Sequence, residues 1–195
     1  MIMMDIQVRC EWCKGEEIYT KYHDKEWGVP LHSDRKLFEF LILEGVQAGL
    51  SWITVLKKRK TYRKVYDQFD FNKIAKYKKA KIQLLLNNPG IIRNKLKVRA
   101  AVKNAQAFIK IREEFGTFNK YIWQFTDGKT IHNSWKLLKD IPAQTEISNL
   151  MSKDLKKRGF TFVGPTICYA FMQAIGMVND HVIDCHRYKQ LKKIN

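Results

Sequence analysis

Two pairs of cysteine and histidine residues stand near opposite ends of the sequence, at spacings that suit a metal ion. Twelve residues separate Cys10 from His23, and three separate His181 from Cys185. Zinc accepts two thiolates and two imidazoles in tetrahedral geometry. Four protein ligands leave no open position, so such a site would be structural and would tie distant parts of the chain together.

Spacing alone leaves the ligand set open. Cys13 forms a Cys-x-x-Cys pair with Cys10, and His186 directly follows Cys185, so each is an alternative ligand. Buried cysteines and core histidines without a metal are a second interpretation. Cys168 lies in an apolar stretch and is expected in the core.

A carboxylate and a group of aromatic residues could form a pocket for a planar, cationic base. Glu44 ends an otherwise apolar helical face, where a carboxylate needs a cation, a hydrogen-bond donor or a ligand. Aromatic rings attract cations and pack against flat heterocycles. The alternatives are core packing of the rings and an ion pair between Glu44 and a Lys or Arg. The aromatic candidates are Trp12, Tyr19, Tyr22, Trp27 and Trp52.

The segment 154–176 has the pattern of a helix, a tight turn and a second helix. Gly159 and Gly164 bound the turn and would let the backbone approach a ligand closely. Free N–H groups at the start of the second helix can hold a phosphate, and Lys156 and Lys157 would add positive charge beside it. An ordinary helical hairpin with a basic last turn has the same pattern.

Hydrophobic residues recur at helical spacing through nearly the whole chain, which predicts an all-α fold. One apolar face follows Ser33 and Asp34, and another runs over 98–109. Only 160–163 alternates like a strand, and the flanking glycines favour a turn there. Further helices are predicted at 51–58, 61–68, 72–86, 118–126 and 148–158.

The charge is strongly positive and unevenly distributed. The chain has 36 Lys plus Arg against 19 Asp plus Glu, a net charge of +17. Over 55–103 there are 16 basic residues and two acidic ones. A nucleic acid is therefore the expected partner. A solvated basic face is the alternative, because 27 of the basic residues are lysines and a genome's base composition can inflate that number.

The length of 195 residues predicts a single domain over 1–195, built from two helical lobes. A polar stretch over 126–146 could connect them, with a basic lobe at approximately 55–125. The start, Met-Ile-Met-Met-Asp, lacks the pattern of a targeting segment, and no apolar run is long enough to span a membrane. A cytoplasmic location without a membrane partner is expected.

Ordered blocks of sequence are more specific than any of these patterns. The blocks are RCEW at 9–12, YHDKEWGVP at 22–30, LEGVQAGLSW at 43–52 and GIIRN at 90–94. The last block spans 159–181, where it begins with GFTFVG and ends with NDH. Over approximately residues 8–188 the chain resembles the DNA-3-methyladenine glycosylase I family, bacterial enzymes of the helix-hairpin-helix superfamily.

The resemblance implies a monomeric enzyme that hydrolyses the N-glycosidic bond of N3-methyladenine in alkylated double-stranded DNA and leaves an abasic site. It implies a structural zinc held by Cys10, His23, His181 and Cys185, with Cys13 outside the set. Because no lysine is positioned to form a Schiff base, we expect a monofunctional glycosylase without strand cleavage.

The resemblance also implies a pocket in which Glu44 accepts hydrogen bonds from the base. Tyr22, Trp52 and Trp12 would surround that base, and Tyr19 and Trp27 are further candidates.

Leu50 is expected to fill the gap that the extruded base leaves in the duplex. Asp180 lies where related glycosylases place a catalytic aspartate, but this family is thought to lack that residue, so Asp180 is not expected to activate water. The alternative function is a non-enzymatic, zinc-stabilised helix-hairpin-helix module that binds DNA or RNA.

Overall fold

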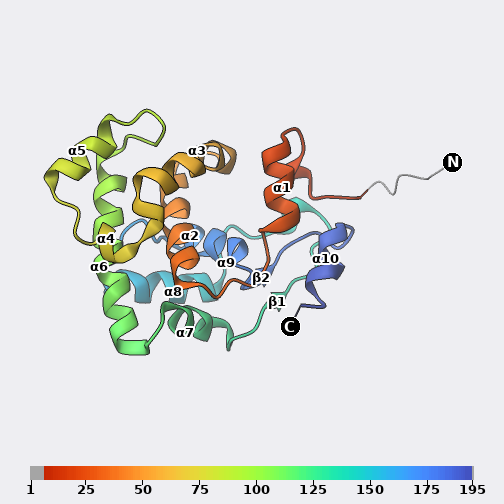
Figure 1. Ribbon diagram of the computed structural model, residues 1–195. Coiled ribbons are helices and arrows are strands. Elements are labelled where there is room, and N and C mark those ends of the chain that lie inside the picture. The colour runs from red at the N-terminus through yellow and green to blue at the C-terminus, as the bar shows by residue number, and fades with distance from the viewer. Residues whose placement is uncertain (1–6, 195) are drawn as a thin grey trace.

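The computed structural model describes residues 7–194, and helices dominate it (Figure 1). This confirms the predicted all-α class. The expectation about the first five residues lies outside the described range. No helix within residues 7–194 is long and apolar enough to cross a membrane. The α-helices of the larger part of the fold are α2 (Asp34–Gln47), α3 (Trp52–Val65), α4 (Phe71–Ile74), α5 (Lys79–Asn87), α6 (Lys95–Phe115), α7 (Phe118–Trp123) and α9 (Pro165–Ala174).

Helix α2 (Asp34–Gln47) lies at the centre of the core. Every residue from Leu37 to Val46 is buried, and the helix packs against α3, α6, α7 and α9. A helix that is buried all round is expected to be apolar all round. Two glutamates on α2, Glu39 and Glu44, break this rule. Each therefore needs a specific explanation.

The prediction of separate helices at 61–68 and 51–58 is wrong, because α3 runs without a break from Trp52 to Val65. Arg59 interrupts the apolar pattern at its middle, yet only 6% of it is exposed. Its guanidinium binds Glu39 at 2.6 Å and Glu26 at 2.7 Å. A buried ion pair therefore takes the place of an apolar contact on the inner face of α3. The charged residue interrupts the hydrophobic pattern, and this interruption led to the wrong prediction of two helices.

The predicted helix at 72–86 is also wrong, since the chain forms two helices, α4 and α5, with a break over 75–78. Tyr77 in this break donates a hydrogen bond to Asp67 at 2.5 Å. Gln106 of α6 donates to the carbonyl of Ala75 at 3.1 Å. Contacts with distant residues thus stabilise a turn where the local pattern is helical.

Helix α8 (Glu146–Lys157) packs against α9 to form the predicted helical hairpin. The turn between them contains 160–163, where the sequence predicts a turn rather than a strand. Gly159 has a φ of +93°, a conformation that favours glycine. The side-chain amide of Asn104 on α6 makes two hydrogen bonds with the backbone of Thr161. Its oxygen accepts from the Thr161 N–H at 2.9 Å, and its nitrogen donates to the Thr161 carbonyl at 3.0 Å. The hairpin turn is therefore fixed to the longest helix of the fold.

The N-terminal and C-terminal segments lie together on one side of the molecule, where Figure 1 shows α1 (Glu17–Lys25) near α10 (His186–Leu191). A short parallel pair, β1 (Ile131–His132) and β2 (Val178–Asn179), joins the polar stretch to the segment after α9. Gly176 has a φ of +75°, and a Cβ there would lie 2.4 Å from the backbone of Val29. This close approach holds the two ends of the fold together.

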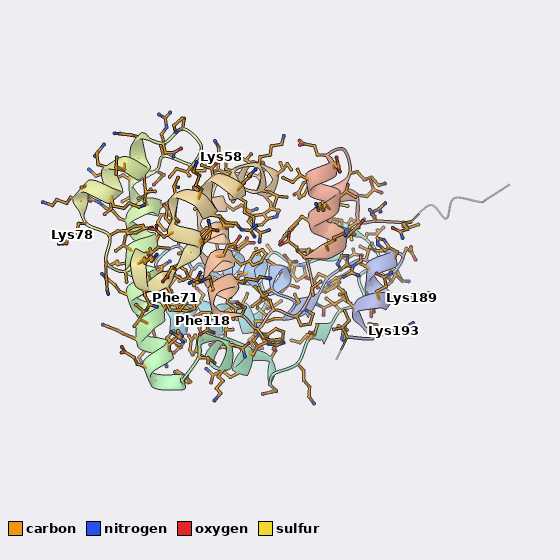
Figure 2. All side chains as sticks on the ribbon, in the orientation of Figure 1. Lys58, Phe71, Lys78, Phe118, Lys189 and Lys193 are labelled. Atoms are coloured by element: carbon orange, nitrogen blue, oxygen red, sulfur yellow. The ribbon has the colours of Figure 1, made fainter. Side chains whose placement is uncertain are left out.

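Basic side chains are not confined to one face. Figure 2 shows Lys58 and Lys78 at the edge of the molecule formed by α3 and α5, and Lys189 and Lys193 at the opposite edge near α10. The excess of positive charge therefore does not by itself define a binding face.

Candidate active site

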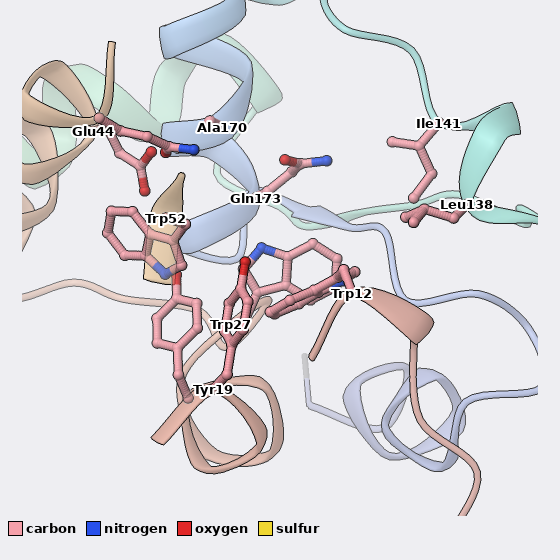
Figure 3. A pocket seen from close by; sticks show the side chains of 11 residues that line it. Trp12, Tyr19, Trp27, Glu44, Trp52, Leu138, Ile141, Ala170 and Gln173 are labelled. Atoms are coloured by element: carbon pink, nitrogen blue, oxygen red, sulfur yellow. The ribbon is translucent and has the colours of Figure 1, made fainter. Parts of the chain in front are cut away.

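A cavity of about 210 Å³ lies where α1, α2, α3 and α9 meet, close to the loop before α8. Figure 3 shows Glu44 at one side of it and aromatic rings along another. Glu44 and all five aromatic residues singled out in the sequence line it. The full lining is Trp12, Tyr19, Tyr22, Trp27, Glu44, Gln47, Trp52, Leu138, Ile141, Ala170 and Gln173.

Sequence reasoning missed five of these lining residues. Gln47 follows Glu44 by three positions, and Ala170 and Gln173 are three apart on α9, so helical spacing could have found them. Leu138 and Ile141 come from the irregular stretch before α8, for which the sequence carries no signal.

Glu44 is 4% exposed and has no hydrogen bond or ion pair with any residue in the range 7–194. Burial raises the pKa of its carboxyl group to about 8, and the charge of Arg59 opposes this rise. Arg59 itself binds Glu39 and Glu26. The alternative of an ion pair between Glu44 and a basic side chain is therefore wrong. A buried acid without a protein partner is a group prepared for a ligand.

The aromatic side chains form a continuous wall. The Trp12 ring centroid lies 4.9 Å from those of Trp27 and Tyr19, and the Tyr22 centroid lies 5.4 Å from that of Trp52. Burial, and then the charge of Glu44, raise the pKa of Tyr22 well above its usual range, so its hydroxyl group stays a donor. The Nε1 atom of Trp52 is buried, and no residue in the described range 7–194 accepts a hydrogen bond from it. Trp52 and Tyr22 thus belong to the core and face the cavity.

Cys10, His23, His181 and Cys185 form one buried cluster whose ligand atoms all lie within 4.8 Å of one another. His181 Nδ1 is 3.1 Å from His23 Nε2, 3.4 Å from Cys185 Sγ and 3.7 Å from Cys10 Sγ. Ligand bonds of about 2.0–2.3 Å around a tetrahedral zinc would place neighbouring ligand atoms roughly 3.3–3.8 Å apart. The cluster can therefore hold a metal ion.

The remaining ring nitrogens of both histidines have partners that orient them. His23 Nδ1 contacts Asp24 at 2.8 Å, and His181 Nε2 contacts the carbonyl of Trp27 at 3.1 Å. Such outer contacts fix the tautomer that a metal requires. Because Trp27 also lines the cavity, the cluster and the pocket share a residue.

The two alternative ligands are outside this cluster. The thiol of Cys13 donates a hydrogen bond to the carbonyl of Cys10, and burial raises the pKa of Cys13 to about 11. His186 contacts the carbonyl of Val8 at 3.0 Å. Cys168 is buried in α9, as expected, with its thiol directed at the carbonyl of Val163.

Asp180 is 1% exposed, and both of its oxygens accept two hydrogen bonds. Oδ1 accepts from Asn133 at 2.6 Å and from Trp135 at 2.8 Å. Oδ2 accepts from Tyr169 at 2.6 Å and from Gln173 at 2.8 Å. A carboxylate occupied in this way has no free lone pair directed at a water molecule. That Asp180 does not act as a general base stays a prediction.

Leu50 is 39% exposed at the turn between α2 and α3, beside Gly49 with a φ of +78°. The turn is anchored by Lys97, whose ammonium group donates to the carbonyls of Val46 at 2.7 Å and Ala48 at 2.6 Å. Leu50 therefore projects an apolar side chain from a turn that is anchored at its base.

The hairpin places Gly164 immediately before α9, with Pro165 at the first helical position. Lys156 and Lys157 are exposed in the last turn of α8, and Gly159 follows in the turn. A smaller cavity of about 180 Å³ separates Leu50 from the start of α9. Leu50 lines it from the turn after α2, and Thr166 and Ile167 line it from α9.

The sequence matches the methyladenine glycosylase family over residues 12–188. The chain belongs to this family. The DNA-3-methyladenine glycosylase of Haemophilus influenzae is 50% identical, over 91% of this chain and 96% of its own.

Two solved structures of methyladenine glycosylases have the same fold. A crystal structure of 3-methyladenine DNA glycosylase I has a TM-score of 0.90 and 48% identity, covering 92% of this chain and 98% of its own. A variant of 3-methyladenine DNA glycosylase I in complex with 3-methyladenine has a TM-score of 0.89 and 34% identity, covering 91% of this chain and 96% of its own.

Proposed function

We propose that this chain is a DNA repair enzyme that hydrolyses the N-glycosidic bond of N3-methyladenine in alkylated double-stranded DNA and leaves an abasic site. The observation that carries the proposal is the unpartnered carboxyl group of Glu44 in a cavity lined by aromatic rings. The family and the relative solved with 3-methyladenine point to the same ligand.

The chemistry of the substrate explains why such a pocket suffices. Adenine methylated at N3 carries a positive charge in DNA and is a good leaving group, so the enzyme must mainly extrude and select the base. The aromatic wall would attract the cation. Burial raises the pKa of Glu44 to about 8, and the positive charge of a bound methylated base would oppose this rise and favour the anion. Unmethylated adenine is neutral and gains neither attraction.

Leu50 and the hairpin are suited to hold the duplex while the base is extruded. Leu50 would fill the gap in the base stack, and the N–H groups at the start of α9 would bind a phosphate near Gly164, with Gly159 allowing close approach. Lys156 and Lys157 would add charge beside it. The cavity lining includes no lysine among residues 7–194, which supports a monofunctional mechanism.

Zinc is the metal that the Cys10, His23, His181 and Cys185 cluster suits best, because it favours two thiolates and two imidazoles in a closed tetrahedral site. When bound, it would supply structural cross-linking and no catalytic step. A single domain of two lobes and a monomer acting in the cytoplasm stay predictions.

The decisive experiment compares the unaltered protein with Glu44→Gln on methylated duplex DNA, with the freed bases separated by chromatography. We expect the unaltered protein to release 3-methyladenine and the variant to lose roughly 100-fold or more in rate, because glutamine cannot supply the negative charge. Affinity for an undamaged duplex, measured by fluorescence anisotropy, should not change. If the unaltered protein releases no base, the non-enzymatic binding module is the correct interpretation.

A further inference from the structure

We infer that Asp180 locks the side-chain amide of Gln173 in one orientation, so that Gln173 acts as a hydrogen-bond acceptor that selects methylated adenine over methylated guanine. This inference rests on the proposed function. Its basis is the contact between Gln173 Nε2 and Asp180 Oδ2, at 2.8 Å, directly behind the cavity wall.

An amide side chain can normally rotate to present either its oxygen or its nitrogen. Asp180 removes this choice, because its two oxygens are acceptors that already receive hydrogen bonds from Asn133, Trp135 and Tyr169. Only the nitrogen of the Gln173 amide can supply the fourth hydrogen bond. Nε2 of Gln173 must therefore face Asp180, and Oε1 must face away.

The side chain of Gln173 lines the cavity. Gln173 and Ala170 are the residues of α9 in its lining. Figure 3 shows the amide oxygen on the side towards Glu44, with the nitrogen turned the other way. Oε1 has no hydrogen-bond partner among residues 7–194. It is a free acceptor in a fixed position.

Two acceptors on the same wall select for a donor on the base. Once Glu44 is ionised, both it and Gln173 Oε1 require hydrogen-bond donors. Adenine has one exocyclic donor, its 6-amino group, which has two hydrogens. Guanine carries a carbonyl oxygen at the same position and would leave these buried acceptors unpaired, which is costly. Methylated guanine should therefore be a poor substrate.

Two variants test the inference on duplexes that contain both 3-methyladenine and 3-methylguanine. In Asp180→Asn, the new amide can donate to Gln173 Oε1, so Gln173 rotates and presents its nitrogen to the base. In Gln173→Leu, the acceptor is lost. We expect the ratio of 3-methyladenine to 3-methylguanine excision to fall at least tenfold in both, because the base-reading acceptor is inverted or absent.

Trp135→Phe is the matched control. It removes a hydrogen bond to the other oxygen of Asp180 and leaves the contact with Gln173 intact, so the ratio should not change. The ratio of 3-methyladenine to 3-methylguanine excision does not change when a variant merely contains less folded protein. Circular dichroism would establish that each variant folds. If Asp180→Asn does not fold, Gln173→Leu decides the question alone.

The outcomes separate the inference from the proposed function. An unchanged ratio in folded Gln173→Leu, or an equal fall in Trp135→Phe, would overturn the role of Gln173 while the unaltered protein still releases 3-methyladenine. Release of neither base by the unaltered protein would instead overturn the proposed function.

Discussion

Two buried glutamates on helix α2 differ in whether they have partners that compensate for the free energy of burying a carboxyl group. Glu44 lies in a helix whose residues 37–46 are all buried, is 4% exposed, and has no hydrogen-bond or ion-pair partner among residues 7–194. Glu39 on the same helix has two arginine partners, Arg59 and Arg63. The difference supports the proposal that Glu44 binds a ligand, and its burial as an acid has a cost in stability.

This cost predicts that Glu44→Gln stabilises the protein. The pKa of Glu44 is raised to about 8 in the folded chain, from an ordinary value of 4.5. The folded state therefore binds more protons than the unfolded state between these values, and the free energy of unfolding falls as pH rises through this window. At pH 7 the variant should be more stable by about 3 kcal/mol, which is about 1.36 kcal/mol for each pH unit above 4.5.

Thermal unfolding followed by circular dichroism between pH 4 and 8 would measure this effect. Near pH 4 the two proteins should unfold at the same temperature, because glutamate is then protonated in both states. A difference that stays constant across the range would show that the charge of Glu44 is not its cause.

Helices and turns supply the geometry that no single residue can provide. If Leu50 fills the gap in the duplex as proposed, the turn after α2 must hold it in place. Lys97 of α6 binds two carbonyl groups at the base of this turn. Cations interact favourably with the C-terminal carbonyls of a helix. Burial lowers the pKa of Lys97. The two carbonyl groups that accept its hydrogen bonds explain why the ammonium group lies at this partly buried position.

Lys97→Met should therefore weaken base extrusion and leave base binding intact. We expect about a tenfold lower kcat/KM on methylated duplex DNA, because Leu50 is no longer held in place. Quenching of tryptophan fluorescence by free 3-methyladenine should be unchanged. Lys95→Met is the control, since it removes the same charge from an exposed position on the same helix. Equal losses in both variants would indicate an effect of charge alone.

Across the whole molecule, the buried cluster of Cys10, His23, His181 and Cys185 joins segments that are 171 residues apart, from Cys10 to His181. It brings the N-terminal segment with Trp12 and Tyr22 against α9 and the C-terminal segment. The aromatic wall of the pocket depends on this arrangement, because Trp27 contacts both the cluster and the cavity.

Loss of the metal should consequently disorder the pocket. The protein as purified should contain about one zinc per chain, and chelation should lower its helical signal and thermal stability. Cys10→Ser should lose the metal, whereas Cys13→Ser should retain it, because the Cys13 thiol lies outside the cluster. Metal analysis of both variants checks this. Retention of zinc by Cys10→Ser would exclude the proposed ligand set.

The sequence alone determined the helical class, the hairpin, and the residue types of the cluster and pocket. Helical periodicity is a local property, and the chemistry of cysteine, histidine and glutamate does not depend on the fold. The tertiary structure decided which partners these groups have. It paired Arg59 with Glu39 and Glu26 instead of Glu44, and it broke the helix predicted at 72–86.

The same reason explains why the hydrogen-bond partners of Asp180, Gln173 and Lys97 could not be predicted from the sequence. Asp180 accepts hydrogen bonds from Asn133, 47 positions away, and Lys97 binds a carbonyl 51 positions away. A buried polar group must be satisfied by whatever donor or acceptor the packed chain brings to it. That pairing exists only once distant helices are in contact, so no local pattern of residues can record it.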